Sequence, residues 1–327
     1  MDHWTRIEAA IAGQAADRVP VALWRHFPVE DQDPGRLAAL TLEWQRQWDF
    51  DLVKFMPSGT YSVEDWGAQS VYQPAFNGAR SISVPGVKRA EDWRRLARLD
   101  PRIGVLGAQN EALARAAKEL RGEVPILQTV FSPLTTARKL AGEALLAHLR
   151  SDPEAVEAGL RVITDTTIGF ALEAVKNGAH GLFFATQLAT TDVLTVPEYQ
   201  RFGVRFDLEV LREIKSSARV SMLHLHGENL MFDQLASYPV EMINWHDRLT
   251  APSLKNALNK FRGIVVGGVE ERELIVTGGE PAVRAQVRDA IAQTGGRRLM
   301  VGPGCVVAIA APEHNIRAVI EEARKAS

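Results

Sequence analysis

Short apolar runs rich in β-branched residues recur along the chain and alternate with longer stretches of helical pattern. The run 124–131 is a typical strand buried on both faces. In 151–179 apolar residues recur with the helical period, and Asp152, Pro153 and Gly178 mark its two ends. Alternation of this kind predicts an α/β fold with a parallel sheet. We expect eight strands, at 20–24, 50–55, 124–131, 180–186, 221–227, 241–246, 263–269 and 298–304.

Eight strands separated by helices favour a closed (β/α)8 TIM barrel over an open, doubly wound sheet. A first helix is expected at about residues 2–16, before the first strand. The stretch 56–100 looks like an insertion between the second and third strands. No linker rich in Pro, Gly or Ser divides the chain, so residues 1–327 are interpreted as one barrel domain.

Composition narrows the function classes without naming one. The chain is 46% hydrophobic and 24% charged, with a formal net charge of -2, which argues against nucleic acid as the main partner. No window is apolar enough for a membrane helix, and the first residues do not resemble a secretory signal. A single cysteine, Cys305, excludes an internal disulfide framework and suits a reducing cytoplasm. We therefore expect a cytoplasmic protein with a small-molecule substrate, as a monomer or homodimer.

The segment "SMLHLHG" places two histidines where the fifth strand ends. His224 and His226 are two residues apart, so they share one face of the strand at the barrel mouth, where barrel enzymes keep their functional groups. Cys305 follows "VGPG" at the exit of the eighth strand and opens onto the same mouth. Two imidazoles and one thiol predict a metal site, with zinc as the candidate metal. The alternatives are two hydrogen-bonded histidines and a cysteine buried as a small apolar residue.

Other polar residues lie at strand exits around the same predicted mouth. Those after the first strand, Arg25 and His26, are candidates to bind an acidic substrate group. Either Asp247 or Glu228 is expected to orient a ligating imidazole. Ordinary salt bridges or loop contacts explain each of these residues equally well. The remaining candidates are Tyr61, Asp65 and Trp66 in the loop after the second strand, Asn244 and His246 after the sixth, and Glu270 and Glu271 after the seventh.

Three segments together resemble the uroporphyrinogen decarboxylase superfamily: "ADRVPVALW", "NWHDR" and "VGPGCVVAIAAPEHNIRAVIEEAR". The resemblance covers nearly the whole chain and implies a (β/α)8 barrel that begins with a helix. Of the positions that bind the porphyrinogen in true decarboxylases, only the first arginine is matched here, by Arg25. Their strand-two aspartate, their tyrosine and their C-terminal histidine have no counterpart, and the last falls at Pro303.

A second branch of the superfamily consists of zinc methyltransferases that move a methyl group between a corrinoid protein and a thiol. Those enzymes carry H-x-C-G and P-G-C motifs whose three residues bind zinc. Here "HLHG" and "PGC" match, with His224 and Cys305 in their places and His226 replacing the first cysteine. A neutral imidazole in place of a thiolate makes the site less negative and the metal a stronger Lewis acid. A hydroxyl or methoxy group then becomes a candidate for activation by the metal, in addition to a thiol.

These observations leave three hypotheses. The first is a zinc-dependent methyltransferase with a corrinoid or small methylated donor, whose substrate and cofactor contacts come from Tyr61, Trp66 and Asn244. The second is a metal-independent decarboxylase, in which Arg25 binds a carboxylate and a proton comes from His224, His246 or Asp65. The third is a barrel that binds a tetrapyrrole or corrinoid without turnover. The ionisable residues at the mouth favour an enzyme over the non-catalytic barrel of the third hypothesis. The candidate catalytic residues are Arg25, Asp65, Glu228 and His246.

Overall fold

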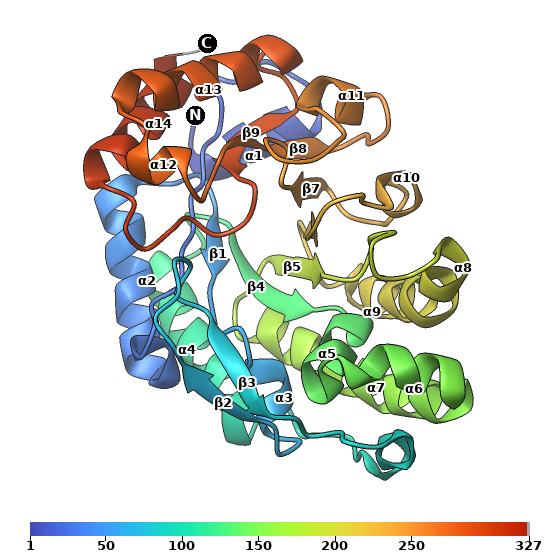
Figure 1. Cartoon of the computed structure of the whole chain (residues 1–327). Helices are drawn as coiled ribbons and strands as arrows, with labels where there is room; N and C mark the ends of the chain where they lie inside the picture. The colour runs from blue at the N-terminus through green and yellow to red at the C-terminus, as the bar shows by residue number, and fades with distance from the viewer. Residues whose placement is uncertain (326–327) are drawn as a thin grey trace.

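Seven parallel strands curl into a ring, and helices pack around its outside (Figure 1). The computed structural model describes residues 1–325. Every residue of these seven strands is buried, because the helices cover one face and the barrel interior the other. The predicted barrel is confirmed, and seven of the expected runs form its strands. In sheet order they are β1 (Val53–Phe55), β4 (Ile126–Phe131), β5 (Gly181–Thr186), β6 (Met222–Leu225), β7 (Met242–Trp245), β8 (Ile264–Val269) and β9 (Leu299–Pro303).

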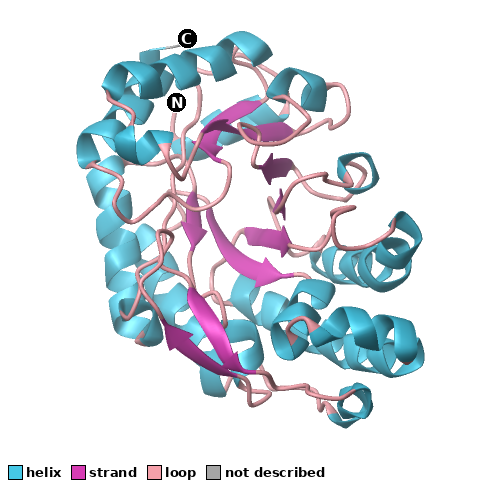
Figure 2. Ribbon diagram, viewed as in Figure 1, coloured by secondary structure: helices cyan, strands magenta, loops and turns pink. Residues whose placement is uncertain are grey.

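The helices form the outer layer in Figure 2, around the magenta strands. Asp152 caps α7 as expected, since its side chain accepts a hydrogen bond from the N–H of Ala155. No helix within residues 1–325 is long and apolar enough to cross a membrane. The α-helices are α1 (His3–Ile11), α2 (Pro34–Trp48), α3 (Tyr61–Glu64), α4 (Gly104–Leu120), α5 (Pro133–Ala141), α6 (Ala144–Ser151), α7 (Pro153–Lys176), α8 (Val196–Tyr199), α9 (Arg205–Ile214), α10 (Phe232–Leu235), α11 (Leu254–Leu258), α12 (Leu274–Thr277), α13 (Glu280–Thr294) and α14 (Glu313–Lys325).

The expected first strand, residues 20–24, is not a regular strand, although it fills the gap between β9 and β1. It makes one isolated bridge, between Val21 and Val301 of β9. Toward β1, the Val21 carbonyl accepts from the N–H of Asp51 at 2.9 Å, while the Val21 N–H donates to the Asp51 carboxylate at 2.8 Å. A side chain thus takes the place of a neighbouring carbonyl, and this segment closes the ring as an eighth, irregular member.

The N-terminal helix α1 is shorter than predicted, because the chain turns at Gly13 with φ +68°. It lies against the barrel through the fully buried Asp51. That carboxylate accepts from Arg6 of α1 at 2.6 Å and from Arg18 at 2.7 and 3.0 Å. Arg6 therefore fixes the helix to the segment before β1 by a charge-assisted contact, and Arg18, which follows the helix, adds a second.

The insertion after the first sheet strand adds a two-stranded antiparallel hairpin, β2 (Gln69–Tyr72) and β3 (Arg80–Val84), outside the ring (Figure 1). Its connecting turn reaches the C-terminal side of the barrel. There Gly78 adopts φ +73°, and an added Cβ would lie 2.4 Å from Ile309. The left-handed backbone at this position favours glycine. The remaining short helices are η1 (Glu30–Gln32), η2 (Ala90–Arg95) and η3 (Gln200–Val204, a π-helix).

Candidate metal centre

The two histidines of the HLH segment lie at the C-terminal end of β6. His224 is 4% exposed and lies opposite Asn244 of β7 in the parallel register. The His224 Nδ1 is 2.6 Å from the Asn244 side-chain oxygen, and the Asn244 amide nitrogen donates to the carbonyls of Val266 and Pro303, both at 2.9 Å. Since that oxygen only accepts, Nδ1 carries the proton and the His224 Nε2 lone pair is free.

A third imidazole, His246, joins the pair from the end of β7. Its Nε2 lies 3.1 Å from the His226 Nδ1, and its Nδ1 lies 2.7 Å from a carboxylate oxygen of Glu271. Glu271 is 1% exposed. The carboxylate accepts the Nδ1 proton and fixes the ring so that its Nε2 points toward the other histidines.

Cys305 completes the cluster from the turn after β9, with its Sγ 3.9 Å from the His226 Nδ1. The preceding Gly304 explains how the backbone comes this close. A Cβ at that position would lie 2.7 Å from Glu271 Oε2 and 2.9 Å from the His246 Cα. The glycine of the GPGC turn therefore leaves the space in which Glu271 and His246 meet.

One donor atom from each of His224, His226, His246 and Cys305 lies within 4.8 Å of the others. A tetrahedral zinc with bonds of about 2.0–2.3 Å separates its donors by roughly 3.3–3.8 Å, so only small side-chain movements are needed. Burial lowers the pKa of His224 well below its usual value and that of His226 to about 3, so both rings are neutral and offer lone pairs. Burial raises the pKa of the Cys305 thiol, an effect that a bound cation would reverse. These residues fit a zinc ion.

The cluster forms part of the wall of a cavity of about 200 Å³ at the barrel mouth. His224, His226 and Cys305 contribute from one side, and the hairpin turn contributes Asn77 and Ala79. The cavity is smaller than the about 300–1,000 Å³ typical of sites for drug-sized ligands. It suits a small molecule better than a tetrapyrrole.

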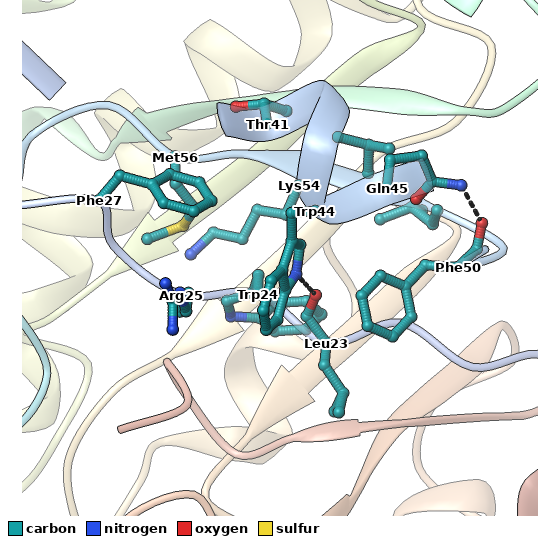
Figure 3. A pocket seen from close by; sticks show the side chains of 12 residues that line it. Leu23, Trp24, Arg25, Phe27, Thr41, Trp44, Gln45, Phe50, Lys54 and Met56 are labelled. Atoms are coloured by element: carbon teal, nitrogen blue, oxygen red, sulfur yellow. Dashed lines mark hydrogen bonds between the residues drawn. The ribbon is translucent and has the colours of Figure 1, made fainter. Parts of the chain in front are cut away.

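Arg25, expected at the mouth, lies elsewhere. Its guanidinium stacks 4.9 Å from the ring centroid of Trp44 on α2 and 5.6 Å from that of Phe27. Figure 3 shows Arg25, Phe27 and Trp44 in a small pocket that is distinct from the cavity at the mouth. His26, the neighbour of Arg25, lines the cavity instead. Because adjacent residues of an extended segment face opposite sides, only one of the two reaches the interior.

Four other candidates do not line the cavity, and three of them bind the protein's own backbone. The Tyr61 hydroxyl donates to the Thr129 carbonyl at 2.7 Å, and the Trp66 indole donates to the Ala97 carbonyl at 2.8 Å. The Asp65 carboxylate accepts from the first N–H groups of α4 at 2.9 and 3.0 Å. Glu228 is exposed, and its carbonyl accepts from Thr190. These contacts are structural, so the expected roles of these residues in binding and catalysis find no support in their positions.

The residue that orients His246 was among the candidates at the mouth, but the orienting role was assigned to Asp247 or Glu228. Asp247, one of the two expected orienting acids, accepts instead from the N–H of Gly268 at 3.0 Å and pairs with Arg248. Glu271 orients His246 instead. In the sequence, Glu271 was visible only as one of two adjacent acids after a predicted strand, which gave no sign of this role. Asn244 orients His224 and was expected to contact a cofactor.

Comparison with known proteins agrees with this architecture. The model of the uroporphyrinogen decarboxylase (URO-D) family matches residues 3–326. The methylcobamide:CoM methyltransferase MtbA of Methanosarcina acetivorans is 20% identical over 332 residues, covering 98% of this chain and 96% of the relative. The uroporphyrinogen decarboxylase of Phenylobacterium zucineum is 24% identical, covering 95% and 94%. A solved methyltransferase from Methanosarcina mazei, 20% identical, superimposes with a TM-score of 0.83 over 99% of this chain and 98% of its own.

Proposed function

Because this chain belongs to the uroporphyrinogen decarboxylase family, we propose that it is a zinc-dependent methyltransferase acting on a small thiol or hydroxyl acceptor. Its similarity to methyltransferases over nearly the whole chain makes it a methyltransferase-like enzyme. The observation that carries the proposal is the cluster of three imidazoles and one thiol at the barrel mouth. That position is where barrel enzymes hold their reacting groups.

His224, His226 and Cys305 would hold the zinc, and His246 would occupy the fourth position only until the acceptor replaces it. Bound zinc supplies Lewis acidity, which lowers the pKa of an acceptor thiol or hydroxyl. Asn244 and Glu271 keep the rings of His224 and His246 in the tautomers that present Nε2. A zinc site with one thiolate ligand, as proposed here, is less negative than a site with two thiolate ligands. The zinc is then a stronger Lewis acid, so the acceptor class extends from thiols to hydroxyls.

We propose that the methyl donor is a corrinoid carried by a partner protein, or a small methylated compound, and that the reaction takes place in the cytoplasm. The cavity volume of about 200 Å³ supports a small acceptor. The metal-independent decarboxylase is the weaker hypothesis, since Arg25 and Asp65 lie outside this cavity and are engaged elsewhere.

The test measures methyl transfer from methylcobalamin to a panel of small thiols and alcohols, followed by the visible spectrum of the corrinoid. Protein purified without a metal-affinity step is expected to demethylate the donor in the presence of one class of acceptor. Dialysis against a chelator should abolish this reaction, and added zinc should restore it. Activity that survives complete removal of metal, or turnover only of carboxylated substrates with release of CO2, would contradict the proposal.

Glu271→Gln is expected to weaken zinc binding about 10–100-fold, because the neutral amide no longer holds the Nδ1 proton of His246 with a charge-assisted hydrogen bond. The affinity is measured by competition with a chromophoric chelator. Glu228→Gln is the matched control, since Glu228 is exposed at the same mouth and should leave the affinity unchanged. Equal affinities for the two variants would show that Glu271 does not support the site.

A further inference from the structure

The turn between β2 and β3, residues 73–79, forms one wall of the cavity that contains the histidine cluster. Asn77 and Ala79 of this turn line the cavity, as does Arg80 at the start of β3. The other lining residues come from the ring of strands, from the segments that follow its members and from α5. In Figure 1 the turn meets the loop that follows β9. The hairpin thus supplies a wall of the cavity from outside the ring.

The turn is held to the barrel at one place. The N–H of Ile309, in the loop after β9, donates to the Phe76 carbonyl at 2.8 Å. Within residues 1–325, this is the one hydrogen bond that joins the turn to a segment outside the hairpin. Residues 73–76 are exposed, whereas Gly78 is buried against Ile309. Phe76, Gly78 and Ile309 form this contact, the latch, and a contact this small opens easily.

The base of the hairpin is fixed more firmly than its turn. The Ser70 hydroxyl of β2 donates to the Glu64 carboxylate of α3 at 2.7 Å, and Ile82 of β3 packs against the main core. Just after β3, the N–H of Val87 donates to the Leu140 carbonyl of α5 at 3.0 Å, and Val87 is 1% exposed. A fixed base and a lightly held turn allow the hairpin to swing away from the mouth once the latch breaks.

We propose that the hairpin is a lid that controls which molecules reach Cys305. With the latch closed, the cavity admits molecules of its own size, and larger molecules reach the thiol when the latch opens. Cys305 lies in the loop that also carries Ile309. Opening breaks one backbone hydrogen bond and the packing of Gly78, so the two states differ little in free energy. The lid acts on access, whatever chemistry the cluster performs.

Cys305 reports on the lid because it is the only thiol in the chain. The experiment measures two rates of its modification in the full-length protein after removal of metal. One reagent is iodoacetamide, which is small, and the other is fluorescein maleimide, which is bulky. Any change in the thiol itself alters both rates, so the ratio of the rates reports access.

Two variants remove the latch in different ways. In the first, Asn-Gly replaces residues 73–79. Because Tyr72 and Arg80 are partners across the hairpin, a two-residue turn joins them and leaves β2 and β3 paired. The second variant is Gly78→Leu. A Cβ at Gly78 would meet Ile309, and it would lie 3.2 Å from Pro28 Cδ and 3.3 Å from His26 Cβ. The larger side chain therefore forces the turn away from the barrel.

Both variants are expected to speed the reaction with fluorescein maleimide at least about 10-fold, the effect of losing roughly one hydrogen bond and one apolar contact. The rate with iodoacetamide should stay nearly unchanged. Gly122→Leu is the matched control. Gly122 has φ +74°, close to the +73° of Gly78, but nothing lies within 4 Å of an added Cβ. This control carries the same backbone strain and should react as the wild type does.

Equal maleimide rates in the wild type and the shortened hairpin overturn the proposal, because the mouth then admits large molecules without movement of the lid. Exclusion of the maleimide from both variants overturns it as well. The same holds if both reagents react faster by one factor, which shows a change in the thiol and not in access. If one variant fails to fold, the other decides. A protein that takes up no zinc refutes the proposed function and leaves these rates to decide the role of the hairpin.

Discussion

Replacing Cys305 by alanine is expected to lower the affinity for zinc by at least about 100-fold, from roughly one tightly bound ion per chain to almost none after dialysis. Cys305 is the only thiol in the chain and the only donor of the cluster that becomes anionic on binding. Its loss leaves three neutral imidazoles to hold a divalent cation. Metal content by mass spectrometry and competition with a chromophoric chelator measure the effect.

His224→Ala should lose the metal in the same way, because it removes a buried donor that Asn244 orients. His180→Ala is the matched control. His180 lies at the start of β5, at the other end of the barrel, where its Nδ1 accepts from the N–H of Ile126. It should retain the wild-type zinc content. A Cys305→Ala variant that still holds one zinc per chain as tightly as the wild type would exclude this cysteine as a ligand.

Asp51→Asn is expected to lower the free energy of unfolding by about 3–5 kcal/mol, the effect of breaking a buried ion pair from one side. Asp51 is fully buried and accepts from Arg6, Arg18 and the N–H of Val21. An amide in its place leaves the largely buried guanidinium of Arg18 without a counter-charge and that of Arg6 with Asp17 alone, and it turns a donor toward both. Urea unfolding followed by tryptophan fluorescence measures the loss.

Asp49→Asn provides the comparison two residues away. The Asp49 side chain is 60% exposed and forms a surface pair with Arg324, and asparagine tolerates its left-handed backbone. Such a pair contributes about 0–1 kcal/mol. If the two variants unfold at the same urea concentration, the Asp51 network does not hold the N-terminal helix to the barrel.

The strands could be predicted from the sequence because both faces of a parallel barrel are buried, which leaves continuous apolar runs such as 264–269. The same apolar pattern led to the incorrect prediction of a regular strand at 20–24. There the carboxylate of Asp51 takes the N–H of Val21 that a neighbouring strand would otherwise take. An apolar run predicts that a segment is buried, but it does not predict which atom accepts a given backbone hydrogen bond.

The spacing of His224 and His226 identified part of the candidate site, since alternation along a strand is a local property. The contributions of His246, Glu271 and Cys305 depend on loops, where no such period applies. Arg25 was placed at the mouth from its position in the chain, yet alternation sends His26 there and turns Arg25 toward Trp44. The sequence also gave no sign that the turn 73–79 reaches the cavity, because no local pattern marks a contact between distant segments.

Closure of the ring through Val21 and Val301 sets the order in which a newly synthesised chain can fold. The two partners are separated by nearly the whole sequence, so the barrel stays open on the ribosome until β9 has emerged. The HLH segment is made long before Cys305, which follows the closing strand directly. The donor set is therefore completed only in a nearly finished chain, and zinc supplied during translation would meet at most an incomplete set of ligands.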